Sequence, residues 1–287
     1  MTATDTLRPT IVTMNWNGEE LDLEAYLARI GFTGDVKPDL ETLRALHRAH
    51  IASIPFENLE IMLGRPVNLD LAALQAKLVR QRRGGYCYEQ NLLFAAVLER
   101  IGYSVKGLGA RVRVGATAIR AVTHMLTRVT VEDSQEWLCD VGFGAQGLRE
   151  PIPLRDGIEV RQGPWTFGLV PEDSGVLVLR SLRPGGWEEI YAFTLEERHP
   201  VDYVVMNHYT STHPRSAFTH RPVVQRAAVD TQRSLIDMRM SVEFPDGTRD
   251  ERDVQEGELT DLLAHEFGIE LSDEDATRLI WMHDAGA

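Results

Sequence analysis

The pattern of apolar residues changes near residue 102, and this change constrains the fold more than any other feature of the 287-residue sequence. Before it, apolar residues recur at helical spacing. After it, short runs of β-branched and aromatic residues alternate with turn sequences. Beyond about residue 210 the pattern is mixed, with a hairpin signal followed by two helical segments. Helices, then strands, then a mixed tail predict an α+β protein.

Four helices are predicted in the first third of the chain. Apolar side chains surround the fourth on nearly every side, which predicts a buried central helix. The segment Ser53–Leu59 is predicted to be a loop, because Pro55 disfavours helical backbone at the residue before it. The helices are expected at Leu23–Ile30, after Asp39, at Asp70–Gln81, and from Tyr86 or Cys87 to Ile101.

Antiparallel strands are predicted in the middle third. Turn sequences there separate short β-favouring runs such as Met125–Val131 and Glu136–Val141. This spacing indicates an antiparallel sheet or barrel. In the last third, Pro245–Gly247 indicates a hairpin turn, and residues 258–267 and 272–282 have helical spacing.

Composition excludes several classes of protein. The formal net charge is −13, which argues against sequence-independent binding of nucleic acid and against docking on acidic lipid. Two cysteines are too few for a disulfide scaffold and too far apart for a zinc cluster, so we expect no metal. The N-terminal residues lack the basic-then-apolar order of a signal peptide, and we expect a cytoplasmic protein.

Cys87 is the first candidate for a reactive side chain. It follows a Gly-Gly pair at the start of the predicted buried helix, where unpaired N–H groups and the helix dipole favour a thiolate. Arg82 and Arg83 are close in sequence and are expected to add positive charge. The alternative is a small buried apolar residue, the usual role of a free cysteine. Cys139 lies in an apolar strand-like run, which predicts a packing residue.

A cysteine nucleophile needs a base, and nine histidines compete for that role. His47 and His50 lie among charged residues on a predicted amphipathic helix and are expected at the surface. His124 opens one predicted strand and Asp140 lies in the next, 16 residues later, so an even antiparallel register places them on one face. A buried Asp140 requires a partner such as a cationic imidazole. The alternative is an ordinary strand histidine and an aspartate beside a turn.

The residues around these three side chains resemble the arylamine N-acetyltransferase family. The resemblance rests on the segments Arg83–Glu89, Thr123–Leu126 and Asp140–Gly144. Ser53–Leu59 and Ser211–Phe218 are also similar to that family, and all these segments follow its order from about residue 22 to about residue 280.

The resemblance implies an α+β fold similar to the papain and transglutaminase group of cysteine enzymes. It implies an N-terminal helical bundle that carries Cys87, an antiparallel β-barrel that carries His124 and Asp140, and a C-terminal α/β lid. We place the domains at residues 1–105, 106–210 and 211–287.

The resemblance also implies site residues. Cys87, His124 and Asp140 match the catalytic triad of a family that transfers an acetyl group from acetyl-CoA to an arylamine or hydrazine. The acceptor pocket matches Phe56, Val112, Phe143 and Phe218, and the coenzyme A site matches Gly142, Phe143, Gly144, Thr212 and Ser216.

The sequence is also compatible with other functions. Outlying members of the family close macrocyclic amides on polyketide chains, and nothing in the sequence excludes that activity. A cysteine hydrolase would use the same triad with water as acceptor. A binding protein without catalysis on the same fold is the third alternative. We expect a monomer or homodimer that contacts a small-molecule acceptor and neither nucleic acid nor membrane.

Overall fold

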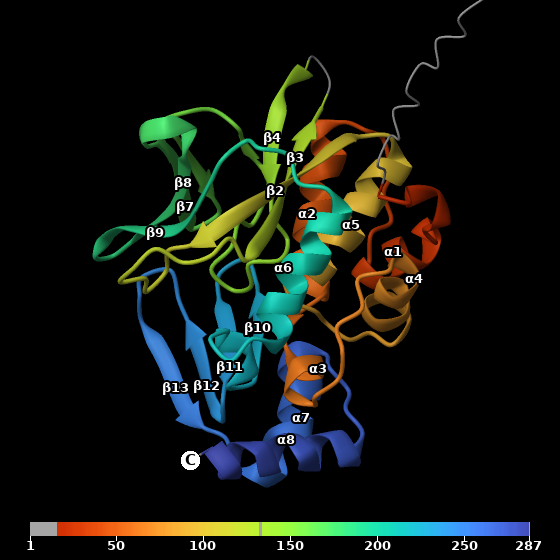
Figure 1. Cartoon of the computed structure of the whole chain (residues 1–287), viewed down its shortest axis with the longest axis vertical. Coiled ribbons are helices and arrows are strands. Elements are labelled where there is room, and N and C mark those ends of the chain that lie inside the picture. Colours follow the sequence, from red (N-terminus) through yellow and green to blue (C-terminus); the bar gives the residue numbers. More distant parts are fainter. Residues whose placement is uncertain (1–15, 132–133, 287) are drawn as a thin grey trace, which may run out of the picture.

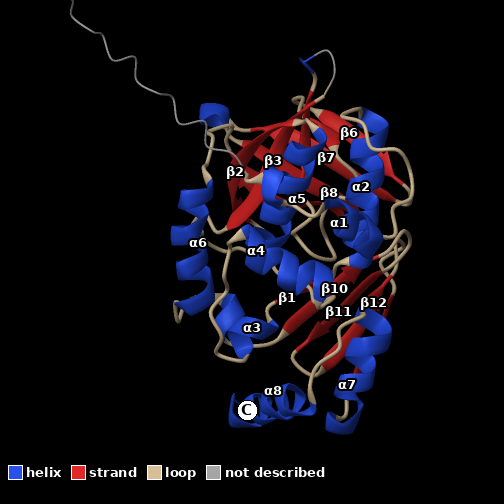
Figure 2. Ribbon diagram, turned by 90° about the vertical axis from the view of Figure 1, so that its right-hand side faces the viewer, coloured by secondary structure: helices blue, strands red, loops and turns tan. Residues whose placement is uncertain are grey.

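The computed structural model describes residues 16–131 and 134–286. Figure 1 shows a sheet of antiparallel strands, a group of helices against one side of it, and a second sheet below. Figure 2 shows α6 running along one side of the molecule from the larger sheet toward α3. The mixed helix-and-sheet architecture predicted from the sequence is therefore confirmed. Within the described ranges, no helix combines the length and apolar character needed to cross a membrane.

The four helices predicted in the first third are present close to their predicted ranges, and the short helix α3, Leu59–Met62, was not predicted. Asp22 and Asp39 each accept a hydrogen bond from the backbone N–H of the third residue of α1 and α2, and thereby cap these helices. The third predicted helix is α4, continued by a π-helical turn over Gln75–Arg80. The bounds are α1 Leu23–Ile30, α2 Leu40–Ser53, α3 Leu59–Met62, α4 Leu71–Leu74, α5 Cys87–Ile101, α6 Pro200–Thr212, α7 Leu259–Leu262 and α8 Asp273–Gly286.

Eight antiparallel strands form the larger sheet, in the order β5-β4-β3-β2-β9-β8-β7-β6. The Gln162 side chain on β6 bonds to the backbone of Arg149 and Glu150 beside β5, so the two edges meet in a nearly closed barrel. The strands are β2 Ser104–Val112, β3 His124–Thr130, β4 Glu136–Cys139, β5 Ile152–Pro153, β6 Ile158–Gln162, β7 Trp165–Pro171, β8 Leu177–Arg183 and β9 Gly186–Phe193.

The second sheet joins the two ends of the chain. Its order is β1-β10-β11-β12-β13, with Phe56 of β1 opposite Gln225 of β10. The prediction of a loop throughout Ser53–Leu59 is therefore wrong, because part of this segment forms β1. The strand that pairs with β1 lies far away in the sequence, so local patterns did not reveal it. The predicted turn at Pro245–Gly247 does join two strands. The bounds are β1 Phe56–Glu57, β10 Val223–Ala227, β11 Gln232–Ile236, β12 Arg239–Glu243 and β13 Arg249–Asp253.

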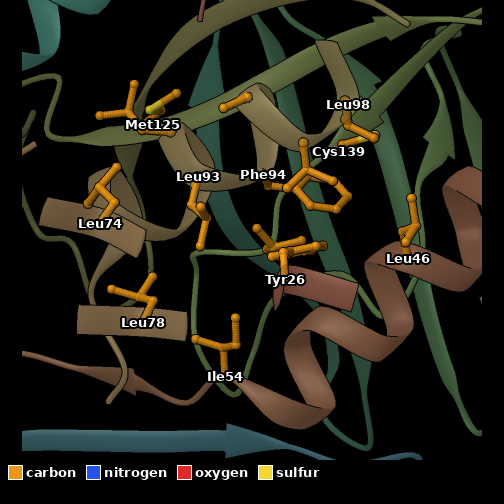
Figure 3. Packing of buried hydrophobic residues seen from close by; sticks show 14 of the residues in the cluster. Tyr26, Leu46, Ile54, Leu74, Leu78, Leu93, Phe94, Leu98, Met125 and Cys139 are labelled. Carbon is orange, nitrogen blue, oxygen red and sulfur yellow. The ribbon is translucent and has the colours of Figure 1, made fainter. Parts of the chain in front are cut away.

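The core that supports the site lies between the helices and the inner strands of the barrel. Helix α5 is buried from Cys87 to Leu98, as predicted. Figure 3 shows Leu93, Phe94 and Leu98 of α5 surrounded by residues of α1, α2 and α4, with Met125 and Cys139 of the barrel on the other side. Packing on several sides fixes the axis of α5, and with it the position of the side chains at its N-terminus.

The prediction that His47 and His50 lie at the surface is wrong. Both side chains are fully buried, since α2 is enclosed between α1, α5 and the barrel. His50 bonds to Tyr26 and Gln90, while His47 lies against the backbone carbonyls of Asp140 and Arg149. The spacing of these histidines relative to Leu43 and Leu46 is that of one helix face, and this signal could have indicated their burial.

Burial of the two histidines predicts loss of stability in mild acid. Burial lowers the pKa of His47 to about 4 and that of His50 to about 3, from an ordinary value of 6.5. As the pH falls below about 6.5, the unfolded chain binds protons before the folded chain does, so each histidine removes about 2 kcal/mol by pH 5. Urea unfolding at several pH values measures the slope. His50→Gln should flatten it, and the exposed His265→Gln is the control; an unchanged slope in His50→Gln would contradict this assignment.

Candidate active site

The start of α5 is shaped by close backbone approaches at the Gly-Gly pair. Gly85 forms a parallel bridge to Phe56, and its N–H donates to the Pro55 carbonyl. A Cβ atom on Gly84 would collide with that same carbonyl. The Glu89 side chain accepts the backbone N–H of Tyr86 at 3.1 Å, which caps the helix. The Gly-Gly sequence therefore lets the chain turn tightly and begin α5 at Cys87.

Buried charges hold this turn in place, and they correct one prediction. Arg83 donates to Glu57 at 3.1 Å and to Glu60 at 3.1 Å, and Lys77 lies 2.7 Å from Glu89. The guanidinium of Arg83 is therefore committed to two carboxylates. The expectation that it adds positive charge beside Cys87 is wrong, because the sequence does not reveal acidic partners about 25 residues upstream.

Cys87 lies against the start of strand β3. Its Sγ is 3.8 Å from the Thr123 carbonyl oxygen, and its side chain lies near enough to His124 to help raise the pKa of that imidazole. Only 3% of Cys87 and 3% of His124 is exposed. A thiol and an imidazole from different parts of the fold thus meet in a place from which bulk water is excluded.

His124 and Asp140 meet as the predicted hairpin requires. Strands β3 and β4 pair antiparallel with Thr127 opposite Cys139, a register that keeps His124 and Asp140 on one face. His124 Nε2 is 2.7 Å from Asp140 Oδ2. Of the predicted turn at 132–135, residues 132 and 133 lie outside the described residues. The structure therefore brings together the three side chains that the sequence singled out.

The electrostatics of the pair favour an imidazolium beside a carboxylate. Burial opposes the charge on both groups, but their mutual attraction and hydrogen bond outweigh it. As a result, the pKa of His124 is raised above its ordinary value, with the nearby Cys87 side chain adding to the effect, and the pKa of Asp140 is lowered. Because Nε2 faces Asp140, Nδ1 is the ring nitrogen left for Cys87.

Asn91 completes the surroundings of Asp140, and the sequence analysis missed it. Its Nδ2 donates to Asp140 Oδ1 at 3.1 Å and to the Met125 carbonyl at 2.8 Å, while its Oδ1 accepts the N–H of Val141 at 3.1 Å. Asn91 stands one helical turn after Cys87 on α5, so it ties the cysteine helix to the aspartate loop. Asn91 is four residues after Cys87, so the two side chains lie on the same face of the helix, and this spacing could have indicated that Asn91 belongs to the site.

Tyr191 of β9 is the second residue that the sequence analysis missed. Its ring lies 5.1 Å from the ring of His124 and 5.3 Å from that of Phe143, and it is fully buried. Burial, with the nearby charge of Asp140 adding to it, raises the pKa of Tyr191 well above its ordinary value. No local pattern could reveal this contact, because it depends on β9 pairing with β2 in the barrel.

Cys139 lies apart from these groups. It is completely buried in the core between α5 and the barrel, where Figure 3 labels it. Burial, with the charge of Asp140 adding to it, raises the pKa of the Cys139 thiol well above its ordinary value. A neutral thiol packed on all sides is a poor nucleophile.

The four residues expected to line an acceptor pocket fall into two groups. Phe56 packs on Phe218 with ring centroids 5.8 Å apart. Phe143 packs edge-on against His124 at 5.0 Å, and Val112 stands opposite Tyr191 across β2 and β9. The groups approach each other where Gly144 lies against Phe56.

The residues expected near coenzyme A have different surroundings. Gly142 lies directly against the backbone of Cys87, and the loop continues through Phe143 and Gly144. The hydroxyl of Thr212 bonds to the His208 carbonyl, and that of Ser216 bonds to the Thr210 carbonyl. Both hydroxyls therefore have a partner within the fold, and Ser216 is buried.

Gly142→Ala should impair the site through geometry alone. A Cβ on Gly142 would lie 2.8 Å from Cys87 Cα and 2.6 Å from Asn91 Nδ2. The loop or the start of α5 must then shift, at a cost of about 1–3 kcal/mol. We expect lower thermal stability and at least a tenfold slower alkylation of Cys87, of the order that a displacement near 1 Å produces. Gly185→Ala, with open space around it, is the matched control; equal behaviour of the two variants would contradict the expectation.

The comparisons with known proteins define first the class and then the family. A sequence model described as N-acetyltransferase matches residues 39–276, which makes the class that of acetyl-transferring enzymes. An arylamine N-acetyltransferase of Mycolicibacterium smegmatis is 39% identical over 260 residues, covering 88% of this chain and 94% of the relative. The chain belongs to the arylamine N-acetyltransferase family, as its motifs predicted.

Solved structures agree with this membership. The arylamine N-acetyltransferase of Nocardia farcinica is similar with a TM-score of 0.89 and 47% identity, over 94% of this chain and 97% of that one. The Mycobacterium marinum enzyme, solved in complex with CoA, has a TM-score of 0.86 and 34% identity, over 93% of this chain and 100% of that one.

Proposed function

We propose that this protein transfers the acetyl group of acetyl-CoA to arylamines and arylhydrazines through an acetyl-Cys87 thioester, with His124 as base and Asp140 as orienting carboxylate. The observation that carries the proposal is the buried contact of Cys87, His124 and Asp140, with Nε2 and Oδ2 2.7 Å apart. Family membership supports the reaction class.

The chemistry proceeds in two transfers. His124 holds the proton of the Cys87 thiol, and the sulfur attacks the thioester carbonyl of acetyl-CoA; CoA leaves as a thiol with that proton. The amine then attacks acetyl-Cys87, His124 takes the amine proton, and the Cys87 sulfur leaves and regains a proton from the imidazolium. Asp140 holds the ring and stabilises its charged form. The Cys87 backbone N–H, at the start of α5, stabilises the oxyanion of both tetrahedral intermediates.

Exclusion of water explains why an amine and not water completes the cycle. The first transfer exchanges one thioester for another and is nearly balanced in free energy, whereas the second forms a more stable amide. Acetyl-Cys87 must persist until the amine arrives, so water has to be kept away from it. The low exposure of Cys87 and the rings of Phe56, Phe143 and Phe218 support this role.

Coenzyme A requires a polar region beside the thiol. The similar Mycobacterium marinum protein was solved with CoA. Here a cavity of about 580 Å³ lies between the Gly142–Gly147 loop and the second sheet, lined by Arg221 and Gln232 among others. The Nε2 of Gln232 is buried and has no hydrogen-bond partner among the described residues. We propose that the polar arm of CoA enters this cavity past the loop, with Thr212 and Ser216 supporting the wall rather than donating to the cofactor.

The domain organisation follows the same proposal. We infer a helical domain at residues 1–105, a barrel domain at 106–210 and a C-terminal lid at 211–287, in an arrangement related to the papain and transglutaminase group. The pairing of β1 with β10 supports a lid that is anchored beside Cys87, since Phe56 also bridges to Gly85.

Incubation with acetyl-CoA separates this function from its alternatives. Release of free CoA that depends on an arylamine, with formation of the acetylated amine, supports the proposal. Release with water alone supports a cysteine hydrolase, and absence of release supports a fold without catalysis. Turnover of a polyketide amine but of no simple arylamine would favour an amide synthase of the same family.

Kinetic order provides a further prediction. One thiol accepts the acetyl group and then donates it, so CoA must leave before the amine attacks. Double-reciprocal plots of initial rate at several fixed amine concentrations should be parallel lines. Intersecting lines would mean that both substrates bind together and would reject a single acetyl-thiol carrier.

A further inference from the structure

One buried imidazole contacts both ends of the loop that carries part of the proposed site. This loop, residues 140–149, leaves β4 at Asp140 and ends shortly before β5. His47 Nε2 lies 3.1 Å from the carbonyl oxygen of Asp140 and 3.4 Å from its backbone nitrogen. His47 Nδ1 lies 3.3 Å from the carbonyl oxygen of Arg149. A residue of α2 thus holds a loop whose ends lie 93 and 102 residues later in the sequence.

Both nitrogens of this ring have a partner on the loop. Burial lowers the pKa of His47 to about 4, so the ring is uncharged at neutral pH and has one N–H group. With the hydrogen on Nδ1, the ring donates to the Arg149 carbonyl, and the lone pair of Nε2 accepts the backbone N–H of Asp140. We assign this tautomer because the other one would direct a lone pair at the Arg149 carbonyl oxygen. His47 therefore ties the two ends of the loop to each other and to α2.

The first half of the loop lies next to the thiol. The carboxylate of Asp140 bonds to His124 Nε2 at 2.7 Å. Gly142 lies against the backbone of Cys87, and its N–H donates to Asp140 Oδ1 at 3.0 Å. A shift of the Asp140 backbone therefore moves the carboxylate, and with it the imidazole that takes the proton of Cys87. We expect the contact between His47 and Asp140 to govern proton transfer.

The second half of the loop is bound to Arg149. The guanidinium of Arg149 donates to the Ala145 carbonyl at 2.8 Å and to the Gly147 carbonyl at 3.0 Å. Only 6% of Arg149 is exposed, so these hydrogen bonds are sheltered from water. Ala145 and Gln146 line the cavity proposed for the polar arm of CoA. We expect the contact between His47 and Arg149 to govern the position of this wall.

We propose that His47 is a positioning residue that acts through the two ends of the 140–149 loop. Its Nε2 holds Asp140 in place for proton transfer, and its Nδ1 holds the wall of the CoA cavity in place through Arg149. His47 itself touches neither the thiol nor the substrates. The inference rests on the proposed function and adds to it a residue outside the triad.

Two conservative variants each keep one of the two contacts. The amide of asparagine lies near the position of Nδ1, so His47→Asn keeps the contact to Arg149 and loses that to Asp140. The longer glutamine places its amide near Nε2, so His47→Gln keeps the contact to Asp140 and loses that to Arg149. Two quantities are measured near neutral pH in the whole protein. They are the rate at which iodoacetamide alkylates Cys87, located by peptide mapping, and the KM for acetyl-CoA with an arylamine.

The two variants should differ in which quantity changes. In His47→Asn, alkylation should be slower by about fivefold or more, the size of one neutral hydrogen bond, with little change in KM. In His47→Gln, the KM should rise by about the same factor while alkylation keeps its rate. Tyr26→Phe is the matched control, because it removes another buried hydrogen bond of α2, that of the Tyr26 hydroxyl to His50 Nδ1 at 2.9 Å, and leaves the His47 contacts in place. It should lower the melting temperature and change neither quantity.

The results distinguish positioning from packing. If both His47 variants lose alkylation and affinity together in step with their melting temperatures, or if neither quantity changes, His47 only packs in the core and the inference is overturned. Equally slow alkylation in Tyr26→Phe would overturn it too. If His47→Asn does not fold, His47→Gln decides, since slow alkylation or an unchanged KM in the folded variant contradicts the inference. Failure of the unmodified protein to acetylate any arylamine, with the difference in alkylation intact, would instead overturn the proposed function.

Discussion

Replacing Cys87 with alanine should abolish acetyl transfer, whereas Cys139→Ala should keep most of it. Cys87 stands at the start of α5 in contact with His124, while Cys139 is enclosed in the core. Loss of a nucleophile lowers turnover by about four orders of magnitude or more. The cost of Cys139→Ala is one of packing, about 1 kcal/mol, and should appear as a lower melting temperature.

Labelling with iodoacetamide gives an independent readout of the same prediction. Near neutral pH the reagent should modify Cys87 first, and activity should fall in step with that modification. Circular dichroism of Cys87→Ala controls for folding. Preferential labelling of Cys139, or full activity in a folded Cys87→Ala, would show that the thiol has been assigned wrongly.

Asp140→Asn should reduce the rate by about four orders of magnitude and leave the fold intact. Asparagine is nearly isosteric, and its Oδ1 still accepts the N–H of Gly142, which now bonds at 3.0 Å. Its NH₂ group, however, faces His124 Nε2 and favours the tautomer with hydrogen on Nδ1. That tautomer has no lone pair directed at Cys87 and cannot take the proton of the thiol.

The pH dependence distinguishes a catalytic from a structural role for Asp140. Asp140 raises the pKa of His124 against the opposing effect of burial. Without the carboxylate, burial prevails and the pKa of His124 falls, so the fraction of imidazolium at neutral pH drops. Alkylation of Cys87 in Asp140→Asn should then be slow at neutral pH, with thermal unfolding close to that of the unmodified protein. An unfolded variant would indicate a mainly structural residue, and near-normal turnover would contradict the triad.

Local sequence patterns predicted much of this site. Gly31 and Gly102 end α1 and α5 in left-handed backbone, as glycine at a helix C-terminus does. The 16-residue separation of His124 and Asp140 predicted one face of a hairpin, and the two side chains form a hydrogen bond. Both predictions depend only on periodicity and on residues that are neighbours along the chain.

The errors arise where distant segments meet. Helix α2 carries charges on one face, but the barrel and α5 cover the other, so His47 and His50 are buried. Arg83 forms a hydrogen bond with a carboxylate of β1, the strand that pairs with β10. Tyr191 reaches His124 only through the order of strands in the barrel. Such contacts depend on tertiary packing, which no single window of sequence contains.

Mass spectrometry of the protein incubated with acetyl-CoA in the absence of amine tests the central claim most directly. We predict one acetyl group per chain, carried on the peptide that contains Cys87. Addition of an arylamine should remove the acetyl group and yield the acetylated amine in equal amount. An unmodified protein that nevertheless acetylates the amine, or an acetyl group on Cys139 in place of Cys87, would contradict the account.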